Sequence, residues 1–252
     1  MKITATIQAR LGSTRLPGKV LKDMAGKPML QQHVERIQKS RLINETVIAT
    51  TTNPEDDAVE TLAKKIGVSC FRGSENDVLS RVASLLKTYS VDVHVELFGD
   101  SPLTDVKILD EVIEYFLKNE KDFDFVSNGI KVTYPAGMEA NVYRAQTLIR
   151  VDQLLKATDP LREHVGTNIQ KNPVFRCKNL EAPPELTRPD LYLEVDTEKD
   201  YQVLSAIFSH FAQKGAKYFS LAEILKFIDT RPDLAALNQN EHRRWKSVKN
   251  IE

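Results

Sequence analysis

Three cationic side chains stand close together near the start of the chain. The stretch QARLGSTRLPGKVL, residues 8–21, contains Arg10, Arg15 and Lys19 together with two glycines, one proline and two hydroxyl side chains. It follows the short apolar segment ITATI, which predicts a strand. In a loop of this kind, backbone N–H groups and cationic side chains can bind phosphate oxygens. The stretch is therefore a candidate phosphate-binding loop.

The loop differs from the P-loop of many nucleotide-binding proteins. That pattern, G-x-x-x-x-G-K-[ST], ends on a hydroxyl side chain that binds the metal ion. Here Gly12 and Gly18 stand one residue too far apart, and Val20 occupies the position of the hydroxyl. The loop is consequently either an ordinary basic turn or a nucleotide-binding loop of another design.

Two further loops carry an acidic residue directly after a predicted strand. GDSPLTD, residues 99–105, follows VDVHVELF, and DTEKD, residues 196–200, follows LYLEV. In an open parallel sheet, ligands bind beyond the carboxyl ends of the strands. Asp100 and Asp196 can hold a hard divalent cation such as Mg²⁺ there, against the phosphates that the basic loop binds. The combination indicates a nucleoside triphosphate with a metal ion, bound without a P-loop.

Each of these loops also has a simpler interpretation. Most charged side chains at a protein surface are only solvated. Asp100 can shape a turn beside Ser101 and Pro102, and Asp196 can supply a favourable charge at the start of a helix. These explanations would all have to hold together at one edge of the sheet, so a shared site is favoured over them.

A parallel sheet is needed to bring the loops together, and the first 130 residues predict one. Short apolar runs alternate with segments whose apolar residues recur at helical spacing, and parallel strands need such crossover helices. Strands are expected at 46–52, 68–71, 91–98 and 122–128. The fold class is therefore α/β with a mostly parallel sheet.

The pattern changes after residue 130. KVTYPAGMEANVYRAQTL, residues 131–148, has turn residues between two alternating segments, which predicts a hairpin-like insertion. PVFRCKNL and LYLEV are expected to be strands, and Thr197 with Asp200 resembles a capping box at the start of the next helix. The simplest organisation is a single domain over 1–252 with a smaller inserted element at about 130–190.

Composition limits the function classes. Lys plus Arg and Asp plus Glu both number 35, so the formal net charge is zero, whereas a general nucleic-acid binder needs surplus positive charge. There is no run of 18 apolar residues, and the N-terminal apolar stretch is too short for a signal peptide. Cys70 and Cys177 lack the spacing of a zinc site. We expect a cytoplasmic protein that binds neither nucleic acid nor membrane.

The opening stretch resembles that of the sugar-activating cytidylyltransferases, which include the 3-deoxy-manno-octulosonate (KDO) and acylneuraminate enzymes. It is most similar to the spore-coat-polysaccharide branch, which has A-R-x-G-S-T-R-L-P-G-K-x-L. The resemblance continues, in the family's order, through ATTTNPEDD, CFRGSENDVLSR, GDSPLTD, YPAGMEANVY, REHV and LEVDTEKDYQVL, and covers about 3–230. It implies a Rossmann-like (GT-A-like) nucleotidyltransferase domain, with the inserted element serving acceptor binding and dimerisation, and a homodimer.

The resemblance also implies a reaction, in which CTP and a small sugar acid give a CMP-sugar and pyrophosphate with Mg²⁺ as cofactor. Asp100 and Asp196 would bind the metal. The residues carried over as catalytic are Arg10, Arg15 and Lys19. Those carried over as nucleotide-binding are Ala9, Arg10, Gly12, Ser13, Lys19, Arg72, Ser74, Asp77 and Arg81. The acceptor would be bound by Glu139, Arg162 and His164, of which Arg162 suits a substrate carboxylate through bidentate pairing.

Other functions stay open at this point. The same fold serves nucleotidyltransferases that act on a sugar phosphate or an alditol phosphate, and nucleotide-sugar glycosyltransferases. The latter normally carry a D-x-D metal motif, and DFD at 122–124 has that form, although its alternation with phenylalanine is more typical of an edge strand. A non-enzymatic binding module would require loss of site residues, whereas both aspartates and all three loop cations are present. The acceptor sugar does not follow from the resemblance.

Overall fold

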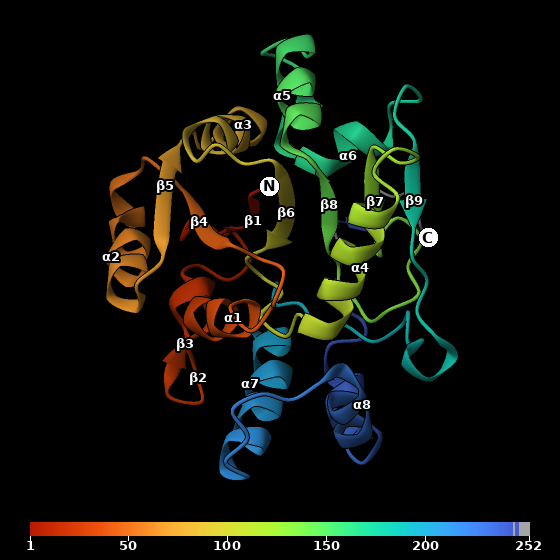
Figure 1. Ribbon diagram of the computed structural model, residues 1–252. Helices are drawn as coiled ribbons and strands as arrows, with labels where there is room; N and C mark the ends of the chain where they lie inside the picture. The colour runs from red at the N-terminus through yellow and green to blue at the C-terminus, as the bar shows by residue number, and fades with distance from the viewer. Residues whose placement is uncertain (244, 247–252) are drawn as a thin grey trace.

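The computed structural model describes residues 1–243 and 245–246. Its centre is a seven-stranded sheet in the order β5-β4-β1-β6-β8-β7-β9, covered by helices on both faces (Figure 1). The strands are β1 Ile3–Gln8, β4 Glu45–Thr51, β5 Ser69–Gly73, β6 Val93–Phe98, β7 Phe125–Ser127, β8 Asn141–Arg144 and β9 Cys177–Asn179. Only β8 runs antiparallel to its neighbours in this sheet, so the predicted α/β fold with a mostly parallel sheet is confirmed.

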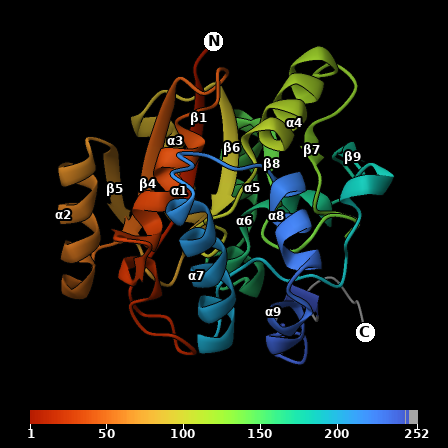
Figure 2. The same cartoon turned by 90° about the horizontal axis from the view of Figure 1, so that it is seen from below.

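The sheet divides the hydrophobic core into two parts, each packed between one face of the sheet and the helices that cover that face. One face is covered by α1 Met29–Ile37, α2 Asp57–Ile66, α4 Val106–Lys118, α7 Glu198–Gln213, α8 Leu221–Asp229 and α9 Pro232–Leu237. The other is covered by α3 Val78–Thr88, α5 Ala145–Leu154 and α6 Val165–Gln170. Figure 2 shows α1, α7 and α8 in front of the sheet and α3, α5 and α6 behind it. A short antiparallel pair, β2 Asp23–Met24 with β3 Lys27–Pro28, precedes α1.

Two helices that follow the functional loops begin at side-chain capping residues. Asp105 accepts hydrogen bonds from the backbone N–H groups of Lys107 and Ile108 at the start of α4. Thr197 and Asp200 form the predicted capping box of α7, each side chain accepting from the other residue's backbone. These caps satisfy N–H groups that have no partner within the helix.

The register of β1 and β6 determines where the functional loops leave the sheet. Gln8, the last residue of β1, is paired with Phe98, the last residue of β6, so the loops that follow start at the same level. The backbone N–H of Gly99 donates to the carbonyl of Gln8 at 3.0 Å. A Cβ atom at residue 99 would lie 2.1 Å from that carbonyl oxygen, so this close approach requires glycine.

Two predictions for the second half of the chain are wrong in detail. Residues 131–140 form no strand, and β8 instead enters the main sheet between β6 and β7. LYLEV, residues 191–195, is also not a strand, because it pairs only at an isolated bridge between Tyr192 and Ala136. It is still extended beside the sheet edge, where the N–H of Val195 donates to the carbonyl of Asp100 at 2.8 Å. That hydrogen bond, rather than a strand, brings the third loop to the other two.

Candidate active site

A cleft lies at the carboxyl ends of β1 and β6 and consists of two chambers. The first chamber has a volume of about 360 Å³ and is lined by residues of the loop after β1 and by the start of α6. The second chamber, of about 490 Å³, lies toward residues 129–139 and 194–196. They share part of their lining, including Arg15, Asp100, Asn141 and Asp196. Volumes of this size suit small-molecule ligands.

The loop after β1 is held in shape by its own backbone and by a buried carboxylate. Asp56, fully buried before α2, accepts a hydrogen bond from the N–H of Leu11 at 2.8 Å. The N–H of Gly18 then returns to the carbonyl of Leu11 at 3.0 Å. Gly18 has a φ of 68°, a left-handed conformation that glycine adopts without strain. The turn directs the next side chain, Lys19, into the cleft, where it lines the first chamber.

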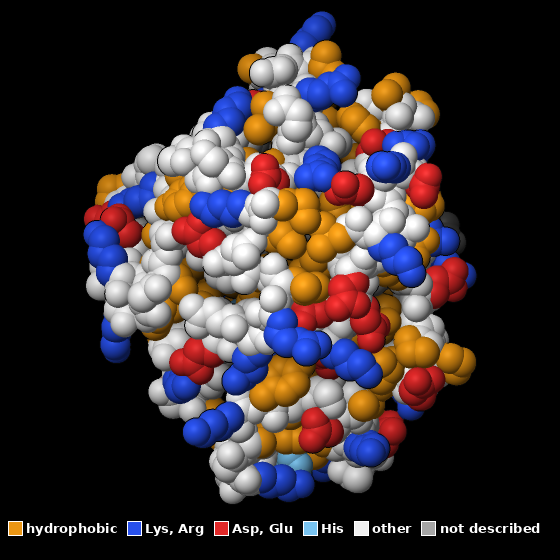
Figure 3. Space-filling model, in the orientation of Figure 1, with side chains coloured by type: hydrophobic (Ala, Val, Ile, Leu, Met, Phe, Trp, Pro, Cys, Tyr) orange, Lys and Arg blue, Asp and Glu red, His pale blue; other side chains and the backbone are white. Residues whose placement is uncertain are grey.

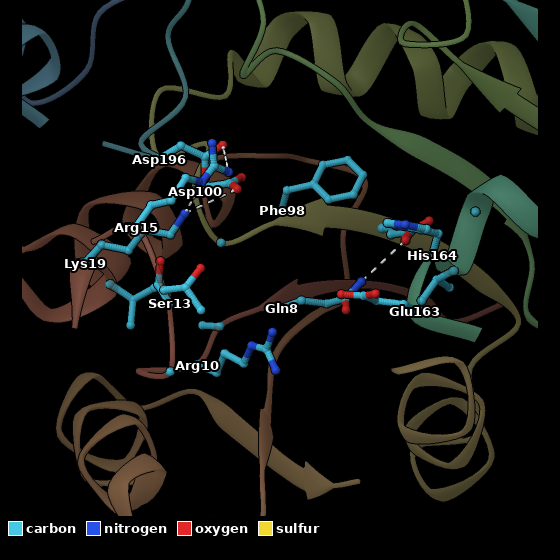
Figure 4. Close-up of a pocket in the computed structure, with 18 of the residues that line it drawn as sticks. Gln8, Arg10, Ser13, Arg15, Lys19, Phe98, Asp100, Glu163, His164 and Asp196 are labelled. Atoms are coloured by element: carbon cyan, nitrogen blue, oxygen red, sulfur yellow. Dashed lines mark hydrogen bonds and ion pairs between the residues drawn. The ribbon is translucent and has the colours of Figure 1, made fainter. Parts of the chain in front are cut away.

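Lys19 lies at the centre of a partly buried cluster of four charged residues. Its Nζ atom is 2.9 Å from Oδ1 of Asp196 and 3.6 Å from Oδ2 of Asp100. Arg15 Nη2 lies 2.6 Å from the other oxygen of Asp196. Figure 4 shows these side chains converging on one side of the pocket, with Glu163 and His164 on the opposite side. The structure thus brings together the two predicted metal ligands and two of the predicted catalytic cations.

The cluster fixes the charge of its members. Burial opposes the charge of Lys19, but Asp100 and Asp196 outweigh this and raise the pKa of its amine above the ordinary value. Burial by itself would raise the pKa of the Asp196 carboxyl, but the positive charges of Lys19 and Arg15 together hold this pKa below its usual range. Both residues therefore stay ionised at neutral pH, with their opposite charges facing one another at the cleft.

The remaining residues of the loop also reach the first chamber. Ala9, Arg10, Gly12 and Ser13 all contribute to its lining. Arg10 is half-exposed, and its Nη1 lies 3.3 Å from Glu75 across the mouth of the chamber. Its cation can thus contact an anion bound in the chamber, because its present partner is a surface carboxylate that it can leave at small cost.

The residues predicted from FRGSENDVLSR do not line either chamber. Arg72 instead pairs with Asp57 and Glu60 beside α2. Arg81 is buried and donates to the carbonyl of Ser74, where its side chain packs against Gly73. Asp77 caps α3 and accepts from the N–H of Ser80, and the Ser74 hydroxyl accepts from the N–H of Asp77. All four have local structural partners, and their place beside the nucleotide stays a prediction.

Two of the three residues predicted to bind the acceptor line the second chamber. Glu139 and His164 both do so, and Oε2 of Glu139 accepts from the N–H of Gly137 at 2.7 Å. Arg162 does not. Its Nε lies 2.8 Å from Asp77 and its Nη2 2.6 Å from Asp152, and its side chain is 8% exposed. The guanidinium is therefore used within the protein, and Arg162 lines neither chamber.

Several lining residues were not predicted from the sequence. In the first chamber they include Glu96 and Asn141, whose side chains are joined by a 3.0 Å hydrogen bond. In the second they include Glu194 and Trp245. Burial raises the pKa of Glu96, and burial with the nearby charges of Asp100, Glu139 and Asp196 raises that of Glu194 well above its usual range. A carboxylate within a buried strand, as in VHVELF, is the signal that identifies Glu96.

The fit of a metal ion can be tested on the charged cluster. Among residues 1–243 and 245–246, no group of three or more His, Cys, Asp or Glu side chains is arranged to hold an ion unaided. Asp100 and Asp196 nevertheless share one cation already, the ammonium of Lys19. Mg²⁺ is commonly bound by one or two carboxylates, with substrate phosphates and water completing its shell. The donor set therefore fits Mg²⁺ bound together with a polyphosphate.

The face of the molecule drawn in Figure 3 does not suggest a polyanion-binding surface. Figure 3 shows acidic and basic side chains intermixed over the face that it presents. This agrees with the equal numbers of acidic and basic residues. Within the part of the chain that the structure describes, no helix is both long and apolar enough to cross a membrane.

Comparison with known proteins gives a consistent result. A family model described as cytidylyltransferase matches residues 4–239. The spore coat polysaccharide biosynthesis protein SpsF of Bacillus subtilis is 32% identical over 234 residues, which cover 91% of this chain and 95% of that protein. The 3-deoxy-manno-octulosonate cytidylyltransferase of Bdellovibrio bacteriovorus is 33% identical over 124 residues, 48% of either chain. The structure of a cytidylyltransferase from Leptospira borgpetersenii has a TM-score of 0.86 at 35% identity and covers 96% of this chain and 99% of that chain.

Proposed function

This chain belongs to the cytidylyltransferase family, and on that premise we propose that it activates a sugar acid with CTP. The products are a CMP-sugar, for synthesis of a surface polysaccharide or glycan, and pyrophosphate. Family membership makes the chain a nucleotidyltransferase, and its α/β fold is that of the Leptospira cytidylyltransferase. A homodimer and a cytoplasmic location stay predictions.

One observation carries the proposal. The loop after β1 and the two acidic loops meet at a single chamber, where Arg15 and Lys19 face Asp100 and Asp196. A triphosphate is an anion that needs cations, and Mg²⁺ needs carboxylates, so this pairing of opposite charges suits their joint binding. If each loop had only its simpler role, nothing would explain why all three loops meet at one chamber.

In the proposed reaction, a hydroxyl oxygen of the acceptor attacks the α-phosphorus of CTP, and pyrophosphate leaves. Such catalysis rests on positioning and on neutralisation of charge more than on covalent chemistry. Lys19 and Arg15 would contact the triphosphate from the floor of the first chamber, and Arg10 from its mouth. The hydroxyl of Ser13, which also lines this chamber, would add a neutral donor to the same phosphates.

Asp100 and Asp196 would hold Mg²⁺, which when bound supplies Lewis-acid neutralisation of phosphate charge. Lys19 already pairs with both carboxylates, and Arg15 pairs with Asp196, so the cations and the carboxylates are in place before substrate arrives. Lys19 can then contact phosphate oxygens without a large movement, because it already lines the chamber. This arrangement keeps the reorganisation needed for catalysis small.

The second chamber would bind the acceptor. Its lining includes the acidic side chains of Asp100, Glu139, Glu194 and Asp196, against the cationic side chains of Arg15 and Lys171. An acceptor with one carboxylate and several hydroxyl groups suits such a lining better than a dianionic phosphate, because like charges at close range repel. This balance favours a sugar acid over the alternatives, a sugar phosphate, an alditol phosphate or a glycosyltransferase substrate.

Pyrophosphate release tests the proposal directly. The enzyme is incubated with CTP, Mg²⁺ and a panel of sugar acids that includes 3-deoxy-manno-octulosonate, and in parallel with sugar phosphates and alditol phosphates. Release that depends on a sugar acid and on CTP is the expected result. Release only with a phosphorylated acceptor would replace the proposed substrate class, and no release with any acceptor and any nucleotide would overturn the proposal.

A further inference from the structure

The chain returns to the cleft after α9. This return segment, residues 241–243 and 245–246, reaches the second chamber through Trp245. The carbonyl oxygen of His242 accepts a hydrogen bond from Nη1 of Arg15 at 3.0 Å. Arg15 uses its other terminal nitrogen to bind Asp196, so the return segment contacts the charged cluster through a single side chain.

Arg243 anchors the return segment in the protein. Its side chain is 1% exposed, and Nη2 donates to Oδ1 of Asp200 at 2.8 Å. Its guanidinium also stacks over the ring of Tyr192, 4.2 Å from the ring centre. The other oxygen of Asp200 accepts from the N–H groups of Asp196 and Thr197. One buried carboxylate therefore holds the acidic loop on one side and the return segment on the other.

Trp245 extends from this anchor into the lining of the second chamber. Its indole Nε1 donates to Oε1 of Glu194 at 2.7 Å, and Glu194 lines the same chamber. Nη1 of Arg243 lies 3.6 Å from that oxygen, so the anchor and the chamber wall are continuous. An indole combines a large apolar surface with one polar donor, a combination suited to the C–H face of a sugar ring.

We propose that Trp245, anchored through Arg243 and bound to Glu194, is an acceptor-specificity residue of the second chamber. The inference rests on the proposed function, since it concerns the acceptor of that reaction. The family match ends at residue 239, before the return segment begins. This wall of the chamber therefore lies outside the residues that the family model matches, and the triphosphate loop lies within them.

Two substitutions separate this role from a purely structural one. Trp245→Ala removes the wall, and Trp245→Phe keeps a ring but removes the donor to Glu194. For Trp245→Ala we expect KM for the sugar acid to rise about tenfold, the equivalent of roughly 1.4 kcal/mol, with KM for CTP unchanged. Trp245→Phe should give a smaller rise. Asn240→Ala, at an exposed position just before the return segment, is the matched control and should match the wild type.

Fluorescence gives a second readout, because Trp245 is the single tryptophan of the chain. Titration with the sugar acid that supports turnover, in the presence of Mg²⁺ and CMP, should change its emission and protect it from quenching by acrylamide. An unchanged emission at saturating sugar acid would count against contact between Trp245 and the sugar acid.

The outcomes distinguish the inference from the proposed function. If the wild-type enzyme releases pyrophosphate but Trp245→Ala keeps its KM for the sugar acid, the inference is overturned and the proposed function stands. If Trp245→Ala raises both KM values together and lowers the thermal midpoint, Trp245 is structural and the inference is again overturned. If the wild-type enzyme uses no sugar acid at all, both fail.

Discussion

The ammonium nitrogen of Lys19 lies 2.9 Å from a carboxylate oxygen of Asp196, a residue 177 positions further along the chain. A second pair, Lys22 with Glu198, joins the same two segments at the same distance. The two pairs differ in burial, since the side chains of the first are 11% and 12% exposed and those of the second 31% and 53%. The outer pair is therefore a matched control for the inner one.

Replacement of Lys19 by Met should remove the cation that faces the triphosphate. We expect kcat/KM for CTP to fall by about 100-fold to 1,000-fold, the loss typical when one preorganised donor to transition-state charge is removed. The measurement is the initial rate of pyrophosphate release. Lys22→Met should stay within about twofold of the wild type, because an exposed ion pair contributes little. Equal losses in the two variants would contradict the role given to Lys19.

Replacement of Asp196 by Asn should weaken the binding of Mg²⁺ to the enzyme. An amide oxygen is a poorer ligand for a hard cation than a carboxylate, so the Mg²⁺ concentration at half-maximal rate should rise at least about tenfold. Titration of activity with Mg²⁺ at saturating CTP measures this. Glu198→Gln, two residues away and exposed, is the control. Full activity of Asp196→Asn at the wild-type Mg²⁺ concentration would exclude Asp196 as a ligand.

Replacement of Arg162 by Met tests whether this residue binds the acceptor, as predicted, or acts only through its ion pairs within the protein. It leaves Asp77 and Asp152 without their common partner, and loss of one member of a buried ion pair costs about 3–5 kcal/mol of unfolding free energy. KM for the sugar acid should not change. Denaturant unfolding and acceptor kinetics are measured on the same preparation, with Arg176→Met, at an exposed pair with Asp124, as the control. A large rise in acceptor KM at unchanged stability would restore the role expected from the sequence.

Acid should destabilise the protein through two buried histidines. Burial lowers the pKa of His94 and of His33 to about 3, whereas a histidine in the unfolded chain has a pKa near 6.5. Between these values the unfolded state binds more protons, so stability is fully present above pH of about 6.5 and falls as the pH drops toward 3. Each histidine contributes up to about 1.4 kcal/mol per pH unit in this window.

The substitution His94→Gln isolates one of these contributions. Gln can keep a hydrogen bond to the hydroxyl of Thr6, which lies 2.7 Å from Nε2 of His94, but it cannot titrate. The unfolding free energy of this variant should therefore depend less steeply on pH between 4 and 6.5. The slope should fall by about the contribution of one histidine. His242→Gln changes an exposed ring and serves as the control. An unchanged slope for His94→Gln would contradict the prediction.

The sequence was sufficient to predict the meeting of the loops, because apolar runs such as ITATI and VHVELF identify neighbouring parallel strands whose ends must coincide. The resemblance to the cytidylyltransferases is confirmed by the family match. The sequence was not sufficient to distinguish a ligand-binding arginine from a structural one. Arg72 and Arg162 find their partners on neighbouring helices, and periodicity predicts which face of a helix is buried but not which charged side chain it meets.

Other features depend on contacts between distant segments. LYLEV has the composition of a strand, yet its neighbours offer it only one bridge and one hydrogen bond to the loop after β6. Trp245 and Glu194 are 51 positions apart, and neither stands in a pattern that predicts a site. Their role could be inferred only after the path of the chain beyond α9 was known.

The separation of Lys19 and Asp196 along the chain has a consequence for synthesis of the protein on the ribosome. The first parallel strands emerge early and can pair while the basic loop still lacks its acidic partners. Domains begin to fold during synthesis, at about 5–20 residues per second. Between synthesis of Lys19 and synthesis of Asp196, an interval of roughly ten to thirty seconds at these rates, the nascent polypeptide therefore carries a basic loop that lacks this acidic partner. Emergence of residues 191–200 would close that interval by supplying Asp196.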